Sequence, residues 1–298
     1  LGTDTGCSVR LPASYNGIAG IRPSIGRVSN HGVGVLAWTL DTVGPMCRTV
    51  EDCAIMFGAI AGHDPHDQQS AATPVPDYAA TLERGLEGMR IAVLADFSLT
   101  GLQTGVERCV SDAVSELERG GALVREVPVH DLEPSISALL TVDIAEPAAY
   151  HAEWLRRQPQ DYGEDVRTLL EAGELYLASH YIQAQRYRTI IRDQFTRILE
   201  DFEAIVTPTV PFTAPEIGVT EVRLEDGQVL DLIPAVMRYN AIPPLTGQPA
   251  LSVPCGFSDD GMPVGMQLIG SAFDEATLFR IGHAYQQRTD WHLRAPAL

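Results

Sequence analysis

The stretch MRIAVLADFSLTGLQTGVERCVSDAVSELERGGALVREVPV, residues 89–129, decides the fold class of this 298-residue sequence. It begins with an apolar run at 89–95 that is typical of a buried strand, and it ends with a second strand-like run at 123–129. Between them, residues 104–119 carry apolar side chains at helical spacing. This order predicts that both strands lie in one sheet and that the helix packs across it.

Strands and helices are predicted to alternate on both sides of this unit. Residues 1–35 are rich in Gly, Ser and Pro, so loops between short strands are expected there. The other predicted elements are a helix at 49–62 with Thr49 as N-cap, helices over most of 144–200 with a break near 158–163, a strand at 204–210, a hairpin at 221–233, strands at 249–254 and 263–269, and a helix at about 274–287. The sequence therefore predicts one α/β domain over 1–298, a mixed, twisted sheet covered by helices on both faces.

Charge and composition exclude several classes of function. The chain has 39 acidic and 21 basic residues, which gives a formal net charge of −18. Nucleic acids and anionic membrane surfaces would repel such a protein, so we expect neither as a partner. Every basic residue is Arg. Without Lys, the chain can form no Lys Schiff base, no P-loop phosphate site and no Ser–Lys catalytic pair of its own.

Cysteine usage and hydropathy favour a cytoplasmic location. The five Cys residues are scattered and never form C-x-x-C, so reduced thiols are expected. No apolar run approaches the ~20 residues that cross a bilayer, and the first residues do not have the pattern of a secretory leader. We therefore expect no membrane partner.

The segment that carries chemistry is LGTDTGCSVRLPA, residues 1–13, which places Ser8 after a Gly-containing turn. A serine hydroxyl is a weak nucleophile, so it needs a base and hydrogen-bond donors for the oxyanion that forms during attack. A tight turn can aim successive backbone N–H groups at one point. The candidates here are the backbone N–H groups of Thr5, Gly6, Cys7 and Ser8. Spacing alone does not separate this interpretation from that of a purely structural serine.

Residues 1–13 resemble the second half of the signature of the amidase signature family, Gly-Thr-Asp-Thr-Gly-x-Ser, an aliphatic residue, and Arg-x-Pro-Ala. Further segments resemble the family in the same order: GIAGIRPS at 17–24, GRVS at 26–29, LDTVGPM at 40–46, TPT at 207–209, LTGQPALSVP at 245–254, GMPVGMQLIG at 261–270 and FDEATL at 273–278. Several independent motifs in one order argue strongly against a chance match.

The resemblance implies an amidase that cleaves a small carboxamide to a carboxylic acid and ammonia or an amine, through a Ser acyl-enzyme and without metal or cofactor. Ser8 matches the family's nucleophile, and the N–H groups of residues 5–8 match its oxyanion hole. The family's cis-Ser and Lys precede this segment, and neither motif is present. We therefore expect that about a third of the catalytic domain lies upstream of Leu1, and that these residues alone are inactive.

Two alternative functions stay open. One is the A-type subunit of a glutaminase/amidotransferase, which passes ammonia to aminoacyl-tRNA together with partner subunits. The segments VGVLAWTLD at 33–41 and AYQQRTDWH at 284–292 look more like stand-alone amidases. The other alternative is a truncated, non-catalytic relic. The expected partner is a small-molecule amide, with a homodimer kept as an option.

Several single positions, near Ser8 and further along the chain, have competing interpretations. Asp4 and Arg10 either form a buried ion pair that braces the loop or contact a carboxylate-bearing substrate. Trp38 is expected in the core rather than in an acyl pocket. The run HDPHD at 63–67 is expected to form a turn rather than a metal site. Cys7 stands where the family usually has Gly, and a positive φ there would cost about 1 kcal/mol or more.

Overall fold

A mixed β-sheet forms the centre of the computed structural model, which describes residues 1–95 and 101–296. Its strands are β2 (Ala19–Arg22), β4 (Met46–Cys47), β5 (Arg90–Leu94), β6 (Leu123–Val127), β7 (Ala204–Pro208), β10 (Ala250–Phe257) and β11 (Pro263–Ile269). Within the described residues the sheet has seven strands in the order β4-β2-β10-β11-β7-β5-β6. The β6–β5–β7 pairs are parallel and the others are antiparallel.

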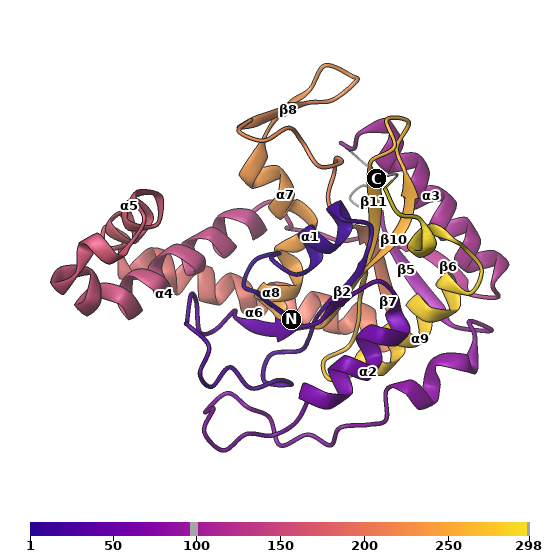
Figure 1. Ribbon diagram of the computed structural model, residues 1–298, viewed down its shortest axis with the longest axis horizontal. Coiled ribbons are helices and arrows are strands. Elements are labelled where there is room, and N and C mark those ends of the chain that lie inside the picture. The colour runs from indigo at the N-terminus through magenta and orange to yellow at the C-terminus, as the bar shows by residue number, and fades with distance from the viewer. Residues whose placement is uncertain (96–100, 297–298) are drawn as a thin grey trace.

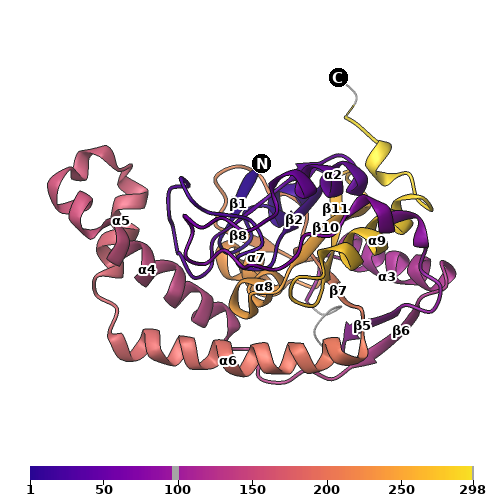
Figure 2. The ribbon, with the colours of Figure 1, turned by 90° about the horizontal axis from the view of Figure 1, so that it is seen from below.

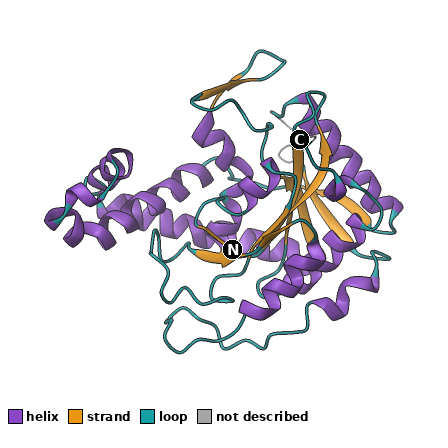
Figure 3. Cartoon of the chain, viewed as in Figure 1, coloured by secondary structure: helices purple, strands orange, loops and turns teal. Residues whose placement is uncertain are grey.

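Helices cover both faces of this sheet (Figures 1 and 3). Because side chains alternate along a strand, Ile91 joins one hydrophobic cluster and its neighbour Ala92 joins the other. The first cluster includes side chains of α2 (Val50–Ile60), α3 (Thr104–Arg119) and α9 (Glu275–Gln286); the second includes those of α4 (Ser135–Arg157), α6 (Ala178–Asp201) and α8 (Ile242–Thr246). The predicted fold class is confirmed.

The strand–helix–strand unit that decided the fold class is present as β5–α3–β6. β5 and β6 pair in parallel, with Arg90 opposite Leu123. The predicted cap of α2 is also present, since Thr49 Oγ1 accepts a hydrogen bond of 3.0 Å from the backbone N–H of Asp52. These elements were predictable because their signals are local.

Several elements differ from the sequence prediction; α4, for example, begins at Ser135 and not near residue 144. Residues 10–15 form α1 (Arg10–Tyr15) where only loops and short strands were expected. Downstream of the correctly predicted hairpin β8 (Glu221–Arg223) and β9 (Val229–Asp231), α7 (Leu232–Asn240) precedes α8. Prolines obscured the helical pattern, because Pro12, Pro234, Pro243 and Pro244 lie in these segments and Pro is the poorest helix former. Packing of α1 on β10 and β11 compensates for its short length.

α5 (Glu164–Gly173) and the ends of α4 and α6 that adjoin it project from the body of the molecule (Figure 2). The predicted break separates α4 from α5 and contains the short 3-10 helix Pro159–Asp161. Two further 3-10 turns are found at Ala79–Arg84 and Trp291–Leu293. In the part of the chain that is described, no helix has the length and apolar character needed to cross a membrane.

A separate two-stranded ribbon, which packs against β2 of the main sheet, carries the start of the candidate site. It consists of β1 (Gly2–Asp4) and β3 (Thr42–Gly44), with Asp4 opposite Thr42. The chain leaves β1 at Asp4 and enters α1 at Arg10. The turn that contains Ser8 is therefore held between the ribbon on one side and α1, packed on the main sheet, on the other.

Candidate active site

The turn between β1 and α1 exposes Ser8 and buries the three residues before it. Within residues 1–95 and 101–296, no acceptor binds the backbone N–H groups of Thr5, Gly6, Cys7 or Ser8. The next two N–H groups, those of Val9 and Arg10, are directed to the Asp4 carboxylate at 3.1 and 3.4 Å. The turn therefore combines an accessible hydroxyl with several unused hydrogen-bond donors.

Asp4 is the anchor of this turn. Its fully buried carboxylate accepts hydrogen bonds from Arg10 Nε and Nη2, both at 3.0 Å, and lies 3.1 Å from Arg22 Nη1. Burial raises the pKa of Asp4, but the charges of Arg10 and Arg22 and the hydrogen bonds outweigh burial and lower the pKa to about 2. The carboxylate is therefore ionised at neutral pH and joins the two ends of the turn.

Arg10 connects the turn to distant parts of the fold. Its Nη2 donates to the carbonyl oxygen of Gly6 at 2.7 Å, and its Nη1 donates to Gln267 Oε1 on β11 at 2.7 Å. The carbonyl oxygen of Asn240 at the end of α7 accepts a further bond at 3.2 Å. Both Arg10 and Asp4 have no solvent exposure, so they form an internal ion pair beneath the Ser8 turn.

Cys7 does not have the backbone strain that was considered for it. Among the described residues, the non-glycine residues with positive φ are Asp131 and Phe273, so the Cβ of Cys7 carries no left-handed penalty. Burial, followed by the charge of Asp4, raises the pKa of the Cys7 thiol to about 12. Because the thiolate is the reactive form, this buried thiol is a poor nucleophile at neutral pH.

Side chains from two helices, α7 and α4, lie close to Gly6. A Cβ added at Gly6 would lie 3.2 Å from Met237 Cε on α7 and 3.7 Å from Leu139 Cδ2 on α4. The turn is thus lined by segments far away in the sequence. Short-range patterns could not identify these walls, because only the tertiary fold brings α4 and α7 to the turn.

Asp143 is a site-proximal residue that the sequence analysis missed. It lies one helical turn after Leu139 on α4, and its buried Oδ1 has no hydrogen-bond partner among the described residues. Burial, together with the charges of Asp41, Glu146 and Asp4, raises the pKa of Asp143 to about 7. An acidic residue within the apolar run LLTVDIA was the only signal that could have indicated it.

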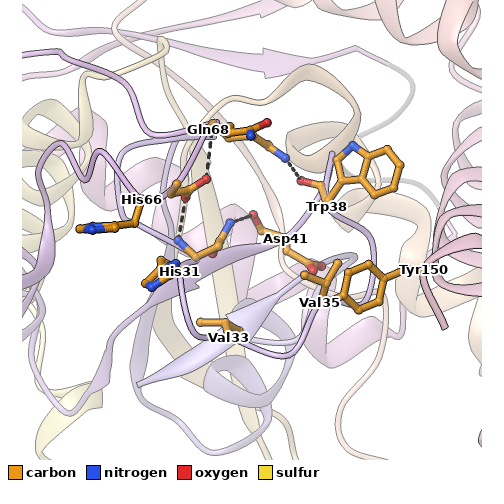
Figure 4. A pocket seen from close by; sticks show the side chains of 11 residues that line it. His31, Val33, Val35, Trp38, Asp41, His66, Gln68 and Tyr150 are labelled. Carbon is orange, nitrogen blue, oxygen red and sulfur yellow. Dashed lines mark hydrogen bonds between the residues drawn. The ribbon is translucent and has the colours of Figure 1, made fainter. Parts of the chain in front are cut away.

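Asp41 links the turn to the loop at 30–41. Thr5 Oγ1 donates a hydrogen bond of 2.6 Å to Asp41 Oδ1, and the backbone N–H of Leu36 donates to Asp41 Oδ2 at 2.9 Å. Asp41 also forms part of the wall of a cavity of about 780 Å³ (Figure 4). Trp38 and Tyr150 line this cavity as well.

The prediction that Trp38 lies in the core is wrong. Its side chain is 45% exposed and lines the cavity, whereas its neighbours Ala37 and Leu40 are buried. The loop turns at this point, since the N–H groups of Leu40 and Asp41 both bind the carbonyl oxygen of Ala37. An aromatic residue can therefore point outward between two core residues, which no periodic pattern would reveal.

The HDPHD run forms a turn. Its two Asp side chains accept hydrogen bonds from residues 29 and 30 of the preceding loop. Asp64 accepts a hydrogen bond from Ser29 Oγ at 2.7 Å, and Asp67 accepts one from the backbone N–H of Asn30 at 2.8 Å. His63 Nδ1 lies 3.2 Å from the carbonyl oxygen of Ser70. Throughout the described residues, no three His, Cys, Asp or Glu side chains are grouped as metal ligands.

Comparison with known protein families shows which family the chain belongs to. A family model described as Amidase matches residues 1–279. The chain belongs to the amidase signature family. The match covers the Ser8 turn, the Asp41 loop, α4 and the sheet that supports them.

Curated relatives of this family member include two kinds of protein. The chain is 40% identical over 298 residues to an amidase from Pseudomonas putida, and the match covers 100% of this chain and 64% of the relative. It is 39% identical to the A-type subunit of the glutamyl-tRNA(Gln) amidotransferase from Roseiflexus sp. (strain RS-1), again covering 100% of this chain and 64% of the relative. The chain thus spans about 64% of the length of these relatives.

Solved structures share the fold. One belongs to a vestigial protein complex that reveals the evolutionary origins of an s-triazine catabolic enzyme; its TM-score is 0.88 at 29% identity, covering 96% of this chain and 62% of the other. Another is the A-type subunit of the glutamyl-tRNA(Gln) amidotransferase from Thermotoga maritima, with a TM-score of 0.80 at 33% identity, covering 96% of this chain and 61% of that one.

Proposed function

We propose that the protein hydrolyses the amide bond of a small carboxamide, with Ser8 as the nucleophile. The observation that carries this proposal is the turn at residues 5–8, where an exposed hydroxyl adjoins four backbone N–H groups that have no acceptor in the described structure. Membership of the amidase signature family supports amide hydrolysis as the general reaction. The burial and raised pKa of the neighbouring Cys7 thiol support Ser8 over Cys7.

The proposed reaction has two halves. Ser8 Oγ attacks the amide carbon as its proton leaves to a base, and the carbonyl π electrons move to the oxygen. Backbone N–H groups of Thr5 to Ser8 stabilise this oxyanion, an effect typically worth ~3–4 kcal/mol for each donor lost. The C–N bond then breaks and the nitrogen takes the proton, leaving an ester on Ser8. Water then attacks the ester as the base takes a proton from it, and this proton passes to Ser8 Oγ as the carboxylic acid leaves.

The base in this scheme comes from outside the 298 residues, because the sequence has no Lys. We assign it to a Lys and a relaying cis-Ser, as the family resemblance implies, in a segment of the full protein that corresponds to the part of its relatives not matched here. A neutral Lys amine would take the proton from the relay serine, which takes it from Ser8. Metal and cofactor have no part in the proposed steps.

Asp4 and Arg10 are positioning residues in this proposal. Neither reaches solvent, and their bonds join β1, the Gly6 carbonyl group, α7 and β11. They hold the N–H groups of the turn in one orientation, and preorganised donors of this kind stabilise a developing charge without reorganisation. Contact of either side chain with a substrate carboxylate would require the turn to open.

A second candidate is the A-type amidotransferase subunit, which the 39% identity to the Roseiflexus protein favours. In that case the substrate would be glutamine, and partner subunits with aminoacyl-tRNA would receive the ammonia. Ammonia release from glutamine that appears only after addition of such partners would favour this candidate. A non-catalytic relic is the third candidate, and it predicts no turnover of any amide.

The test uses the protein expressed from its complete coding sequence and a panel of aliphatic, aryl and carboxylated amides. Ammonia release should disappear in Ser8→Ala and persist in Ser115→Ala, a matched change at an exposed position of α3. Mass spectrometry after rapid quenching should find the acyl group on the peptide that contains Ser8. Activity that survives Ser8→Ala would exclude the proposal. The 298 residues alone should show no turnover.

We also propose a cytoplasmic enzyme whose partner is its small-molecule amide. Free thiols at all five Cys residues support a reducing compartment, and the net charge of −18 disfavours nucleic-acid partners. A homodimer stays a prediction, which light scattering of the purified protein would test.

A further inference from the structure

The cavity beside Asp41 has two chemically different ends (Figure 4). Trp38 and Tyr150 form one end, with exposed fractions of 45% and 39%. His31 and His66 form the other end, where their ring centroids are 5.2 Å apart. A volume of about 780 Å³ is within the range of small-molecule pockets. Half-exposed aromatic rings beside such a volume are surfaces on which a flat group can stack.

The charges along the cavity are of one sign. Asp41 and Asp67 are lining residues, and no Arg lines it among the described residues. Both carboxylates accept hydrogen bonds from backbone N–H groups, of Leu36 for Asp41 and of Gln69 for Asp67, and neither forms an ion pair within the described part of the chain. The charge of Arg22 acts on Asp41, whereas Asp67 has no ion-pair partner among the described residues. The wall near Asp67 therefore favours a positive ligand over a carboxylate.

Asn30, another lining residue, has an amide oxygen without a partner. Its Nδ2 donates to the carbonyl oxygen of Asp41 at 2.9 Å, which leaves Oδ1 buried and without a hydrogen-bond partner among the described residues. A buried acceptor without a donor is costly. This oxygen is enclosed by the wall and is not open to the cavity, so Asn30 braces the Asp41 loop and does not bind the ligand directly.

Two structural elements link the wall of the cavity to the turn that contains Ser8. The first is the 2.6 Å hydrogen bond between Thr5 and Asp41, three residues before Ser8. The second is α4, on which Leu139 contacts the turn and Tyr150 lines the cavity. Leu139 and Tyr150 are about three helical turns apart on this helix, or about 16 Å at 1.5 Å per residue. The turn that contains Ser8 therefore adjoins one wall of the cavity through the Thr5–Asp41 contact.

We propose that this cavity binds the end of the substrate remote from the scissile amide, and that this end is an aromatic group that carries an ammonium. Trp38 and Tyr150 stack on the ring and face the cation with their π systems. Asp41 and Asp67 supply the negative potential that attracts the ammonium. The assignment to a substrate rests on the proposed amidase function, whereas the binding itself can be measured without turnover.

Three probes of similar size separate ring stacking from charge: benzylammonium, benzyl alcohol and benzoate. Each is titrated at pH 7 by calorimetry into the Ser8→Ala form of the protein expressed from its complete coding sequence. We expect benzylammonium to bind at least fivefold more tightly than benzyl alcohol and at least tenfold more tightly than benzoate. Equal affinities, or preference for benzoate, would overturn the proposal, as would the absence of benzylammonium binding.

Matched variants locate the binding. Trp38→Ala should weaken benzylammonium binding about tenfold, whereas Trp154→Ala should not change it. Trp154 is 50% exposed and lies 5.7 Å from the Tyr150 ring, but it does not line the cavity. Asp67→Asn should weaken benzylammonium and leave benzyl alcohol unchanged. Asp77→Asn is its control, because Asp77 makes the same bond to the N–H two residues ahead, away from the cavity.

The outcomes separate this inference from the proposed function. If amides are hydrolysed through Ser8 but Trp38→Ala changes neither binding nor the KM for an amide with a benzylammonium end, the cavity proposal fails and the function stands. If benzylammonium binds with the expected variant pattern but no amide is hydrolysed, the binding site stands and the amidase function fails. The melting temperature of each variant establishes that it is folded.

Discussion

Asp4 Oδ1 and Arg10 Nη2 lie 3.0 Å apart, and both side chains are completely buried. Arg22 Nη1 lies 3.1 Å from the same oxygen, so one carboxylate faces two guanidinium groups. Burial of charged groups is costly unless they are paired and hydrogen-bonded. Removal of one partner leaves the others uncompensated, which makes the residues around this pair sensitive to substitution.

Arg10→Leu should lower the free energy of unfolding by about 3–5 kcal/mol, because Asp4 would lose a bidentate partner in a buried site. Arg10→Lys should rescue little of this loss, since an ammonium cannot reproduce the planar fork that serves Asp4, Gly6 and Gln267. Urea unfolding measures both. Arg108→Lys, at the exposed pair with Asp259, is the control and should have little effect. An Arg10→Leu protein as stable as the control would contradict this account.

Asp4 should make stability depend on pH in the acid range. The pKa of this group falls from 3.8 to about 2 on folding. A lowered carboxyl pKa stabilises the fold fully above pH 4, and the contribution, about 2 kcal/mol, is lost as the pH falls through 2. Asp4→Asn should remove this part of the difference in unfolding free energy between pH 5 and pH 2. An unchanged difference in the variant would show that other carboxylates are responsible.

Asp143 should have the opposite effect. Its pKa rises to about 7 on folding, so the folded protein binds the proton more tightly than the unfolded chain. Stability is then lost as the pH rises from about 4 to 7, by about 2–4 kcal/mol. Asp143→Asn should be more stable than the native protein at pH 8 and nearly equal to it at pH 4. Thermal melts at both pH values test this, and a variant destabilised equally at both would refute it.

Cys7 should resist alkylation in the folded protein. Its buried thiol has a pKa of about 12, whereas the neighbouring Cys53 thiol lowers the pKa of the half-buried Cys47. Iodoacetamide at pH 8 should therefore modify Cys47 first and Cys7 only after unfolding. Peptide mass spectrometry follows both sites. Cys7→Ala should also retain most amidase activity, and a loss as large as that of Ser8→Ala would restore Cys7 as a candidate nucleophile.

Gly44 on β3 is predicted to be intolerant of a side chain. A Cβ at this position would overlap with the carbonyl oxygen of Ile21 on β2. Gly44→Ala should therefore cost more than about 3 kcal/mol of stability, or displace the ribbon and with it Asp4. Gly34→Ala, where an added Cβ meets nothing within 4 Å, is the matched control. Denaturant unfolding and amidase activity together distinguish loss of stability from displacement.

The fold could be predicted where its signals are local. The β5–α3–β6 unit and the β10–β11 pair, with Gly261 at positive φ in the intervening turn, followed from apolar period and turn residues. The helix α1 could not be predicted, because its six residues contain a proline and are stabilised by distant contacts such as the one between Arg10 and Gln267.

The candidate site divides in the same way. Ser8, Asp4 and Arg10 were identified because they occupy one contiguous motif. Asp143 and Tyr150 were not individually identified, since only the packing of α4 brings them to the turn and the cavity. Trp38 was placed wrongly because exposure of a loop aromatic depends on how the loop turns, and composition carries no record of that turn.

The bond between Arg10 and Gln267 joins residues 257 positions apart. Synthesis proceeds from the N-terminus, so a growing chain displays Ser8 long before it contains the glutamine that fixes the guanidinium beneath it. Contacts of such long range also slow folding. The Ser8 turn thus leaves the ribosome well ahead of β11, and its contact with Gln267 can form only after β11 has been made. A chain that ends before β11 would therefore carry Ser8 without the contact that fixes the Arg10 guanidinium beneath it.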